Sequence, residues 1–294
     1  MRILQNRGGM LRRWLEPVLN AQAVWADPLG DLFQRIFRAI YGPFPALRDL
    51  LHGTWLGHPV HPMITDVPIG AFIIATVLDV VGQPVAAAWA IGVGLVSMLA
   101  AALAGYADYI DLEGAGKRIG SLHSTSMLVA LVLYVISLGA RLSWWPLFQG
   151  GAEWTAVIGL LFVVVGGYLG GDLVFNLGSQ VDRHAWRGGG TKWQALDIES
   201  VTEDKPTKAK AGAQTLVIVR RGENIFALHD TCSHQGCSLS EGKLVDEGKR
   251  IECKCHGSRF ELADGSVNRG PAVFPQPHYD VRRAEGKIEV KRSR

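Results

Sequence analysis

HDTCSHQGCSLSEGKLVDEGKRIECKCHGSRF, residues 229–260, is the stretch that decides how the last third of the chain folds. It holds all four cysteines of the protein and three of its nine histidines. They form two groups: Cys232 and His234 at C-x-H spacing, and Cys253 and His256 at C-x-x-H spacing. Thiolates and imidazoles on short loops are typical metal ligands. Metal or redox chemistry is therefore expected here, with the rest of the chain carrying it.

Two kinds of metal centre accept such a donor set. A [2Fe–2S] centre can have two histidines in place of two cysteines on one iron, and tetrahedral Zn²⁺ also takes two cysteines and two histidines. Zinc ribbons and fingers usually carry C-x₂₋₄-C pairs, whereas here each loop supplies one cysteine and one histidine. The spacing favours the iron–sulfur centre and leaves zinc as the competitor.

The same residues resemble the Rieske iron–sulfur family. Its pattern, C-x-H followed by C-x-x-H-G, is met by Cys232, His234, Cys253, His256 and Gly257. The similarity covers about residues 193–290 and continues through Ser258-Arg-Phe260, Ala263-Asp-Gly265 and Gly270-Pro271-Ala272. The resemblance implies an all-β domain in which the cysteines hold an inner iron and the histidines an outer, exposed one. It also implies that the Gly270-Pro271 segment covers the cluster.

The resemblance assigns the two remaining cysteines as well. Cys237 and Cys255 match positions that form a loop-clamping disulfide in the Rieske subunits of cytochrome bc complexes. Two ordinary buried thiols are the alternative, because disulfides are rare in reducing compartments.

Three positions are expected to tune the cluster: Ser258, Gly270 and Pro271. Ser258 matches a residue whose hydroxyl donates to a bridging sulfide in high-potential members, and such a bond stabilises the reduced cluster. Phe260 stands where those members often carry a tyrosine. The resemblance therefore implies an intermediate reduction potential, within roughly −150 to +300 mV.

The middle of the chain is strongly apolar. Segments 64–82, 85–106, 122–142 and 154–177 are each near the roughly 20 residues that span a bilayer. Small residues such as Gly92, Gly94 and the Gly166-Gly167 pair suit close packing of transmembrane helices. A helical bundle of four transmembrane helices followed by an all-β domain is the expected fold, with a buried soluble bundle as the alternative.

These patterns predict four regions. Residues 1–57 are an amphipathic N-terminal region, with apolar residues at helical spacing and a break at Gly42-Pro43, suited to a membrane surface or to packing on the protein itself. Residues 58–177 form the transmembrane domain, and 178–192 a linker with a flexible tract at residues 188–190. Residues 193–294 form the β domain, with strands expected at 214–219, 224–228 and 287–291.

Basic residues set the expected orientation. Lys117, Arg118 and Arg183 are among those beside the spans on the side of both termini, whereas Arg141 flanks the other side. The positive-inside rule then places the β domain in the cytoplasm of a multi-pass protein of the bacterial inner membrane. This placement opposes a disulfide, which cytoplasmic thiols tend to reduce.

A second resemblance begins at LHGTWLGHPVHP, residues 51–62, and extends through Gly170-Gly171-Asp172. It is similar to an uncharacterised bacterial four-helix membrane domain that occurs alone or fused to Rieske domains. The candidate residues for a membrane-side cofactor or quinone site are His58, His61, Asp66, His123 and Asp172. Imidazoles at membrane depth can ligate a b-type haem, bind a quinone headgroup or relay protons. Structural use in caps or in water is the alternative.

The function expected from these features is one-electron transfer by a membrane-anchored Rieske protein, with a redox partner protein or the quinone pool as partner. The alternative is a quinol-oxidising or haem-linked membrane oxidoreductase that uses the histidines of the helices. A formal charge of +3, scattered along the chain, does not indicate nucleic-acid binding. The sequence does not set the oligomeric state.

Overall fold

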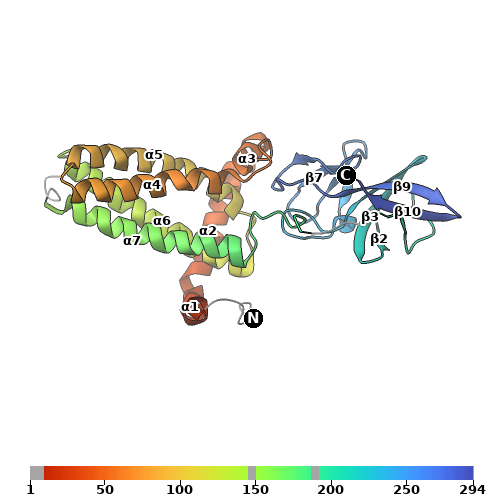
Figure 1. The fold of residues 1–294 in the computed structure, drawn as a ribbon, viewed down its shortest axis with the longest axis horizontal. Coiled ribbons are helices and arrows are strands. Elements are labelled where there is room, and N and C mark those ends of the chain that lie inside the picture. Colours follow the sequence, from red (N-terminus) through yellow and green to blue (C-terminus); the bar gives the residue numbers. More distant parts are fainter. Residues whose placement is uncertain (1–9, 145–149, 187–191, 294) are drawn as a thin grey trace. The chain divides into compact units, whose positions relative to one another are not determined.

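A computed structural model describes residues 10–144, 150–186 and 192–293 of the chain (Figure 1). It divides into two compact units: one from residues 1–45 and Val60–Ser179, the other from Ala46–Pro59 and Gln180–Arg294.

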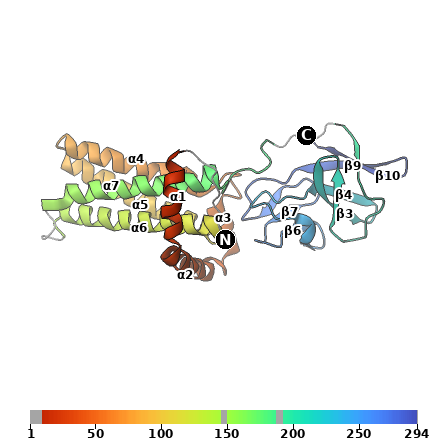
Figure 2. The same ribbon diagram turned by 90° about the horizontal axis from the view of Figure 1, so that it is seen from below.

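The first unit is helical. Its long helices run side by side in Figures 1 and 2: α4 (Val60–Val80), α5 (Pro84–Tyr109), α6 (Gly114–Arg141) and α7 (Ala152–Gly171). A π-helical turn, Asp172–Asn176, extends α7, and α1 (Met10–Ala21) and α2 (Ala23–Tyr41) precede the bundle. The helices α4, α5, α6 and α7, the last with its π-helical extension, are long and apolar enough to cross a membrane. Their outward residues, such as Trp89, Val96 and Val164, are exposed as lipid-facing residues would be, so the predicted fold class is confirmed.

Small residues let the bundle close around two aromatic rings. Phe72 of α4 stacks on Tyr134 of α6 with ring centroids 3.7 Å apart. Gly94 of α5 lies directly against the Phe72 ring, and a side chain there would clash with it. In lipid there is no hydrophobic effect to drive helices together, so close packing of this kind contributes to their association.

Helix α2 packs on the bundle itself. Phe37 stacks on Tyr106 of α5 at 3.8 Å. Gln34 donates to the carbonyls of Tyr109 and Leu112, and Arg38 donates to the carbonyl of Ile110. These donors satisfy backbone carbonyls at the end of α5, which have no partner within their own helix. Helix α2 of the amphipathic segment therefore packs on the protein, which is one of the two uses predicted for this segment.

The second unit is built on two antiparallel sheets. The six-stranded sheet has the order β1 (Gln194–Ala195), β10 (Lys287–Arg292), β9 (His278–Ala284), β4 (Asn224–His229), β3 (Gln214–Arg221) and β2 (Thr207–Ala211). The four-stranded sheet has the order β5 (Lys243–Val245), β6 (Arg250–Glu252), β7 (Arg259–Glu261) and β8 (Val267–Arg269). Helix α3 (Pro45–His52) lies almost wholly within this unit's N-terminal segment. The three predicted strands form β3, β4 and β10, and Gly222 and Gly286 turn the chain between strands with positive φ.

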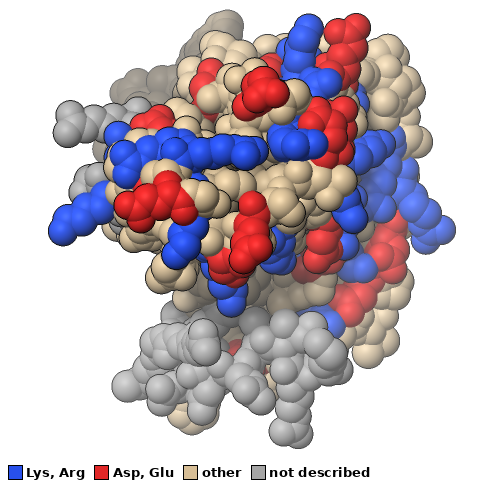
Figure 3. Space-filling view, turned by 90° about the vertical axis from the view of Figure 1, so that its right-hand side faces the viewer, with Lys and Arg blue, Asp and Glu red and all other residues tan. Residues whose placement is uncertain are grey.

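Charges of both signs are interspersed over the outer face of this unit in Figure 3. Many pair across strands, as Arg282 does with Glu289 at 2.7 Å and Arg250 with Glu261 at 2.5 Å. Opposite charges on paired strands support the sheet register.

The predicted glycine tract at residues 188–190 lies outside the described residues. The residues just before it pack on the β domain. His184 is buried, and its Nε2 donates to the carbonyl of Thr231 at 2.9 Å. Residues 180–186 of the predicted linker therefore belong to the second unit.

Candidate metal centre

Two loops with the same backbone pattern carry the four cysteines. One follows β4 and begins at Cys232, and the other follows β6 and begins at Cys253. In the first, the N–H of Cys232 donates to Cys237 and the N–H of Gly236 donates to Cys232. In the second, the N–H of Cys253 donates to Ser258 and that of Gly257 to Cys253. Each loop thus closes over six residues.

A glycine makes each of these turns. Gly236 and Gly257 have φ of 87° and 79°, a region that residues with a Cβ rarely adopt. Each stands four residues after its cysteine. The two loops therefore present their first cysteine in the same way.

The thiols of Cys232 and Cys253 are free, buried and close together. The hydrogen bond with the Cys232 thiol lowers the pKa of Cys253 to about 6. The same hydrogen bond and burial raise the pKa of Cys232 well above its usual value. Cys253 is therefore the thiol that ionises first, and a thiolate is the form that binds metal.

The two histidines of the loops meet edge to face. The ring centroids of His234 and His256 are 4.9 Å apart at an angle of 88°. His234 is only 7% exposed, whereas His256 is half-buried. Burial, and then the neighbouring His256, lower the pKa of His234 well below its usual value. A neutral imidazole is the form that a metal takes. Two thiols and two imidazoles on convergent loops fit the donor set of a Rieske-type [2Fe–2S] cluster.

A disulfide joins the two loops. Cys237 and Cys255 are bonded, with an S–S distance of 2.07 Å and Cα atoms 6.5 Å apart. The sulfur of Cys253 lies within 4.8 Å of both, but sulfurs joined in a disulfide are not thiolate ligands. The predicted pairing is present, and these cysteines act as a clamp.

A third segment, residues 270–276, fixes the two loops. The N–H of Ala272 donates to the buried Oγ of Ser258 at 3.0 Å. Gln276 is buried, accepts from the N–H of Ser233 at 3.0 Å, and donates to the carbonyls of His229 and Thr231. The Gly270–Pro271 bond is cis. Gln276 is a positioning residue that the motif did not reveal.

The segment Ala46–Pro59 supplies a further contact. Oδ1 of Asp49 accepts from the N–H of Gly270 at 2.9 Å, across 221 residues of sequence. A Cβ built at Gly270 would lie 3.0 Å from Oγ1 of Thr54 and 3.4 Å from Cδ2 of His52. Helix α3 and the turn after it thus pack against the Gly270-Pro271 segment. A single aspartate in an amphipathic stretch gave no signal of this role.

Replacing Asp49 with alanine is expected to loosen this contact. The Gly270 N–H would lose its acceptor, at a cost of about 1 kcal/mol for the hydrogen bond. We expect faster bleaching of the visible iron–sulfur absorption in air than in the wild type. Asp49→Asn keeps an oxygen acceptor and is the matched control. Equal bleaching rates in the alanine variant and the wild type would show that the contact does not protect the site.

The five residues proposed for a membrane-side site do not form one cluster. The structure brings together His61 and His123, whose ring centroids are 6.1 Å apart. His58 belongs to the other unit, and Asp66 is exposed on α4. Asp172 is buried in the π-helical turn, where Nδ2 of Asn176 donates to its Oδ1. Asp66 lies inside α4 and does not cap that helix.

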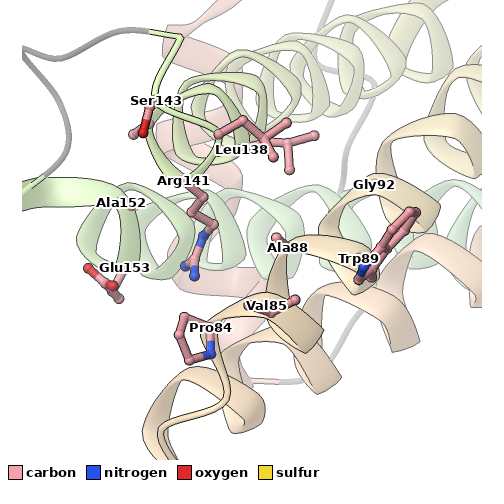
Figure 4. Close-up of a pocket in the computed structure, with 12 residues that line it drawn as sticks. Pro84, Val85, Ala88, Trp89, Gly92, Leu138, Arg141, Ser143, Ala152 and Glu153 are labelled. Atoms are coloured by element: carbon pink, nitrogen blue, oxygen red, sulfur yellow. The ribbon is translucent and has the colours of Figure 1, made fainter.

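At the other end of α4 a pocket of about 630 Å³ opens beside Arg141 (Figure 4). Trp89 and Glu153 also line this pocket. The guanidinium of Arg141 makes two hydrogen bonds, of 2.7 and 2.6 Å, to the carboxylate of Asp79. Both side chains are less than 10% exposed. The ion pair joins α4 to α6 and gives the buried carboxylate of Asp79 a partner.

Comparison with known proteins agrees with this geometry. Residues 192–280 match the Rieske [2Fe-2S] domain, and residues 57–183 match a family described as a predicted membrane protein, DUF2231. The anthranilate 1,2-dioxygenase ferredoxin subunit of Burkholderia cepacia is 35% identical over 100 residues, which are 34% of this chain and 91% of that one. The cytochrome b6-f complex iron-sulfur subunit of Chlorobaculum tepidum is 32% identical over 75 residues, 26% of this chain and 39% of that one.

One of the similar solved structures is a ferredoxin. The ferredoxin of carbazole 1,9a-dioxygenase from Nocardioides aromaticivorans IC177 is 27% identical, covers 34% of this chain and 96% of its own, and superposes with a TM-score of 0.32. The loops and sheets described above define an iron–sulfur domain of the Rieske class. The chain belongs to the Rieske [2Fe–2S] family through its C-terminal domain, which is fused to a DUF2231 membrane domain.

Proposed function

We propose that the protein is a membrane-anchored Rieske protein that carries out one-electron transfer. Cys232 and Cys253 would hold one iron, and His234 and His256 the other. The observation that carries the proposal is the convergence of two buried free thiols and two imidazoles on two equivalent loops. When bound, the cluster supplies a couple that takes up and releases one electron.

The residues around the proposed cluster differ in their exposure to solvent. His256 is the more exposed histidine and is the proposed point of electron entry and exit. The thiols of Cys232 and Cys253 are buried, and so are Gly270 and Pro271. The disulfide holds the loops together whether or not metal is bound.

Ser258, Gly270 and Pro271 are proposed to tune the cluster. The Oγ of Ser258 accepts from Ala272, so its own proton remains for another acceptor, the proposed bridging sulfide. Phe260 is buried in the adjoining core and offers no hydroxyl. These residues support the intermediate potential expected from the sequence.

Replacing Ser258 with alanine is expected to lower the reduction potential by tens of millivolts. Removing a donor destabilises the more negative reduced cluster, and about 1.4 kcal/mol corresponds to roughly 60 mV for one electron. The measurement is a redox titration of the variant, with Ser258→Thr as the hydroxyl-bearing control. An unchanged potential in the alanine variant would remove Ser258 from the tuning set.

The four regions, residues 1–57, 58–177, 178–192 and 193–294, would form an N-terminal region, an anchor, a connection and the redox domain. The anchor would lie in a bacterial inner membrane with the redox domain in the cytoplasm. Relatives named as ferredoxin subunits of dioxygenases, and as a subunit of cytochrome b6-f, support a redox protein or the quinone pool as partner.

Chemical analysis tests the proposal. Purified full-length protein is expected to contain about two iron atoms and two acid-labile sulfides per chain and to take up one electron. One zinc and no labile sulfide per chain would overturn it.

A second candidate is a quinol-oxidising or haem-linked membrane oxidoreductase in which the helices hold another redox partner. The observation that favours it is the pairing of His61 and His123 within the helical unit.

A further inference from the structure

His61 and His123 occupy equivalent places in two helical hairpins. His61 lies near the start of α4, and its Nδ1 is 2.7 Å from the carbonyl oxygen of Ala101 in α5. His123 lies in the first half of α6, and its Nδ1 is 2.7 Å from the carbonyl oxygen of Gly166 in α7. The two contacts span 40 and 43 residues of sequence. The hairpin α4–α5 and the hairpin α6–α7 therefore repeat one arrangement.

A glycine lies beneath each ring, four residues after the carbonyl that the ring contacts. A Cβ on Gly105 would lie 2.8 Å from Nδ1 of His61, and one on Gly170 would lie 3.3 Å from Nδ1 of His123. A side chain at position 105 would clash with the His61 imidazole, so glycine is needed there for the ring to lie against the backbone of α5. The glycines thus fix where both rings lie.

The backbone contacts also decide the tautomer of both histidines. A carbonyl oxygen only accepts, so each Nδ1 must carry the proton. In a neutral imidazole the Nε2 atom then has a free lone pair. Histidines that bind metals almost always donate the other ring N–H in this way.

The separation of the rings fits a metal between them. Metal–nitrogen bonds of about 2 Å to two facing Nε2 atoms place the imidazole centroids roughly 6 Å apart. The observed distance is 6.1 Å, with the ring planes at 87°. The rings come from α4 and α6, so a metal there would connect the two hairpins.

The metal must bring most of its own ligands. Among the described residues, the one group of three or more cysteine, histidine or acidic ligand atoms close enough to share a metal is the cysteine trio of the other unit. A bare ion between His61 and His123 would have two protein ligands, fewer than the usual four. A haem iron brings four porphyrin nitrogens and needs two axial ligands.

We infer that His61 and His123 are the axial ligands of one non-covalently bound haem in the helical domain. The inference rests on the second candidate function above, which requires a redox centre in the helices. It is independent of the cluster, because the two sets of ligands belong to different units.

The experiment uses the full-length protein in detergent, purified from cells supplied with a haem precursor and then titrated with haemin. The wild type is expected to bind about one haem per chain, with a Soret band and the EPR spectrum of a low-spin ferric haem with two imidazoles. His61→Ala and His123→Ala should each lower haem binding at least tenfold. His123→Met, which keeps an axial ligand, should retain haem with an altered spectrum. His58→Ala is the matched control and should bind haem as the wild type does.

Cluster signals separate the outcomes. Retention of the iron–sulfur EPR signal in His61→Ala would show that this variant is folded, and Cys253→Ala should lose that signal while keeping its haem. Haemin that does not bind the wild type, or that binds it and His61→Ala equally, would overturn the inference. So would a bare metal ion or a quinone found at one per chain in place of haem. None of these results would bear on the Rieske centre.

Discussion

Cys253→Ala protein is expected to contain no iron–sulfur cluster. Cys253 is buried, lies against the thiol of Cys232, and has the lowered pKa that favours the thiolate. Without it one iron would have a single protein ligand. Iron should fall from about two atoms per chain to almost none, and the EPR signal of the reduced protein should vanish. His256→Ala is expected to have the same effect through the other iron.

The control for this loss is a histidine on the same domain that is not in the ligand set. His278 begins β9 and is half-buried. His278→Ala should keep its iron and its signal. Normal cluster content in Cys253→Ala or His256→Ala would contradict the ligand assignment.

Removing the disulfide should destabilise the domain without removing a ligand. The bond joins Cys237 to Cys255, which are 18 positions apart in the sequence. In the chain-entropy description, a loop of this size is worth about 3 kcal/mol through restriction of the unfolded chain. The variant with serine at both positions is expected to assemble the cluster and to lose it at a markedly lower denaturant concentration than the wild type.

The disulfide can also be removed by chemical reduction. Cys255 is exposed, so a reductant can reach the bond. Mild thiol reduction of the wild type should reproduce the behaviour of the double variant, since both lack the clamp. Cluster loss at the same denaturant concentration in all three samples would mean that the disulfide does not hold the loops together.

Much of the redox domain could be predicted because its information is local. C-x-H and C-x-x-H-G fix two short loops, and alternating or continuous apolar runs mark β3, β4 and β10. The length and composition of the four apolar segments likewise indicated the spans. The strands β5 to β8 have three residues each, too few to show a period.

The contacts that complete the site were not predictable, because they join distant segments. Asp49 reaches Gly270 across 221 residues, and Gln276 links three backbone groups through one buried amide. Neither residue stands in a periodic pattern. The polar end of α5 extends beyond the predicted span, and side chains of the distant α2 satisfy the carbonyls there.

The histidines of the helical unit were likewise predictable as candidates, but their contacts were not. The sequence offered five candidate residues for a membrane-side site, and packing of the hairpins brings His61 and His123 together. Their partners are backbone carbonyls, which carry no side-chain signature.

The most direct measurement is a redox titration of the purified full-length protein, followed by EPR of the reduced cluster. A Rieske cluster in this protein is expected to give a one-electron wave between roughly −150 and +300 mV, in a signal that carries couplings to histidine nitrogens. A signal without nitrogen coupling, a potential near −400 mV as in plant-type ferredoxins, or no paramagnetic cluster at all would contradict it.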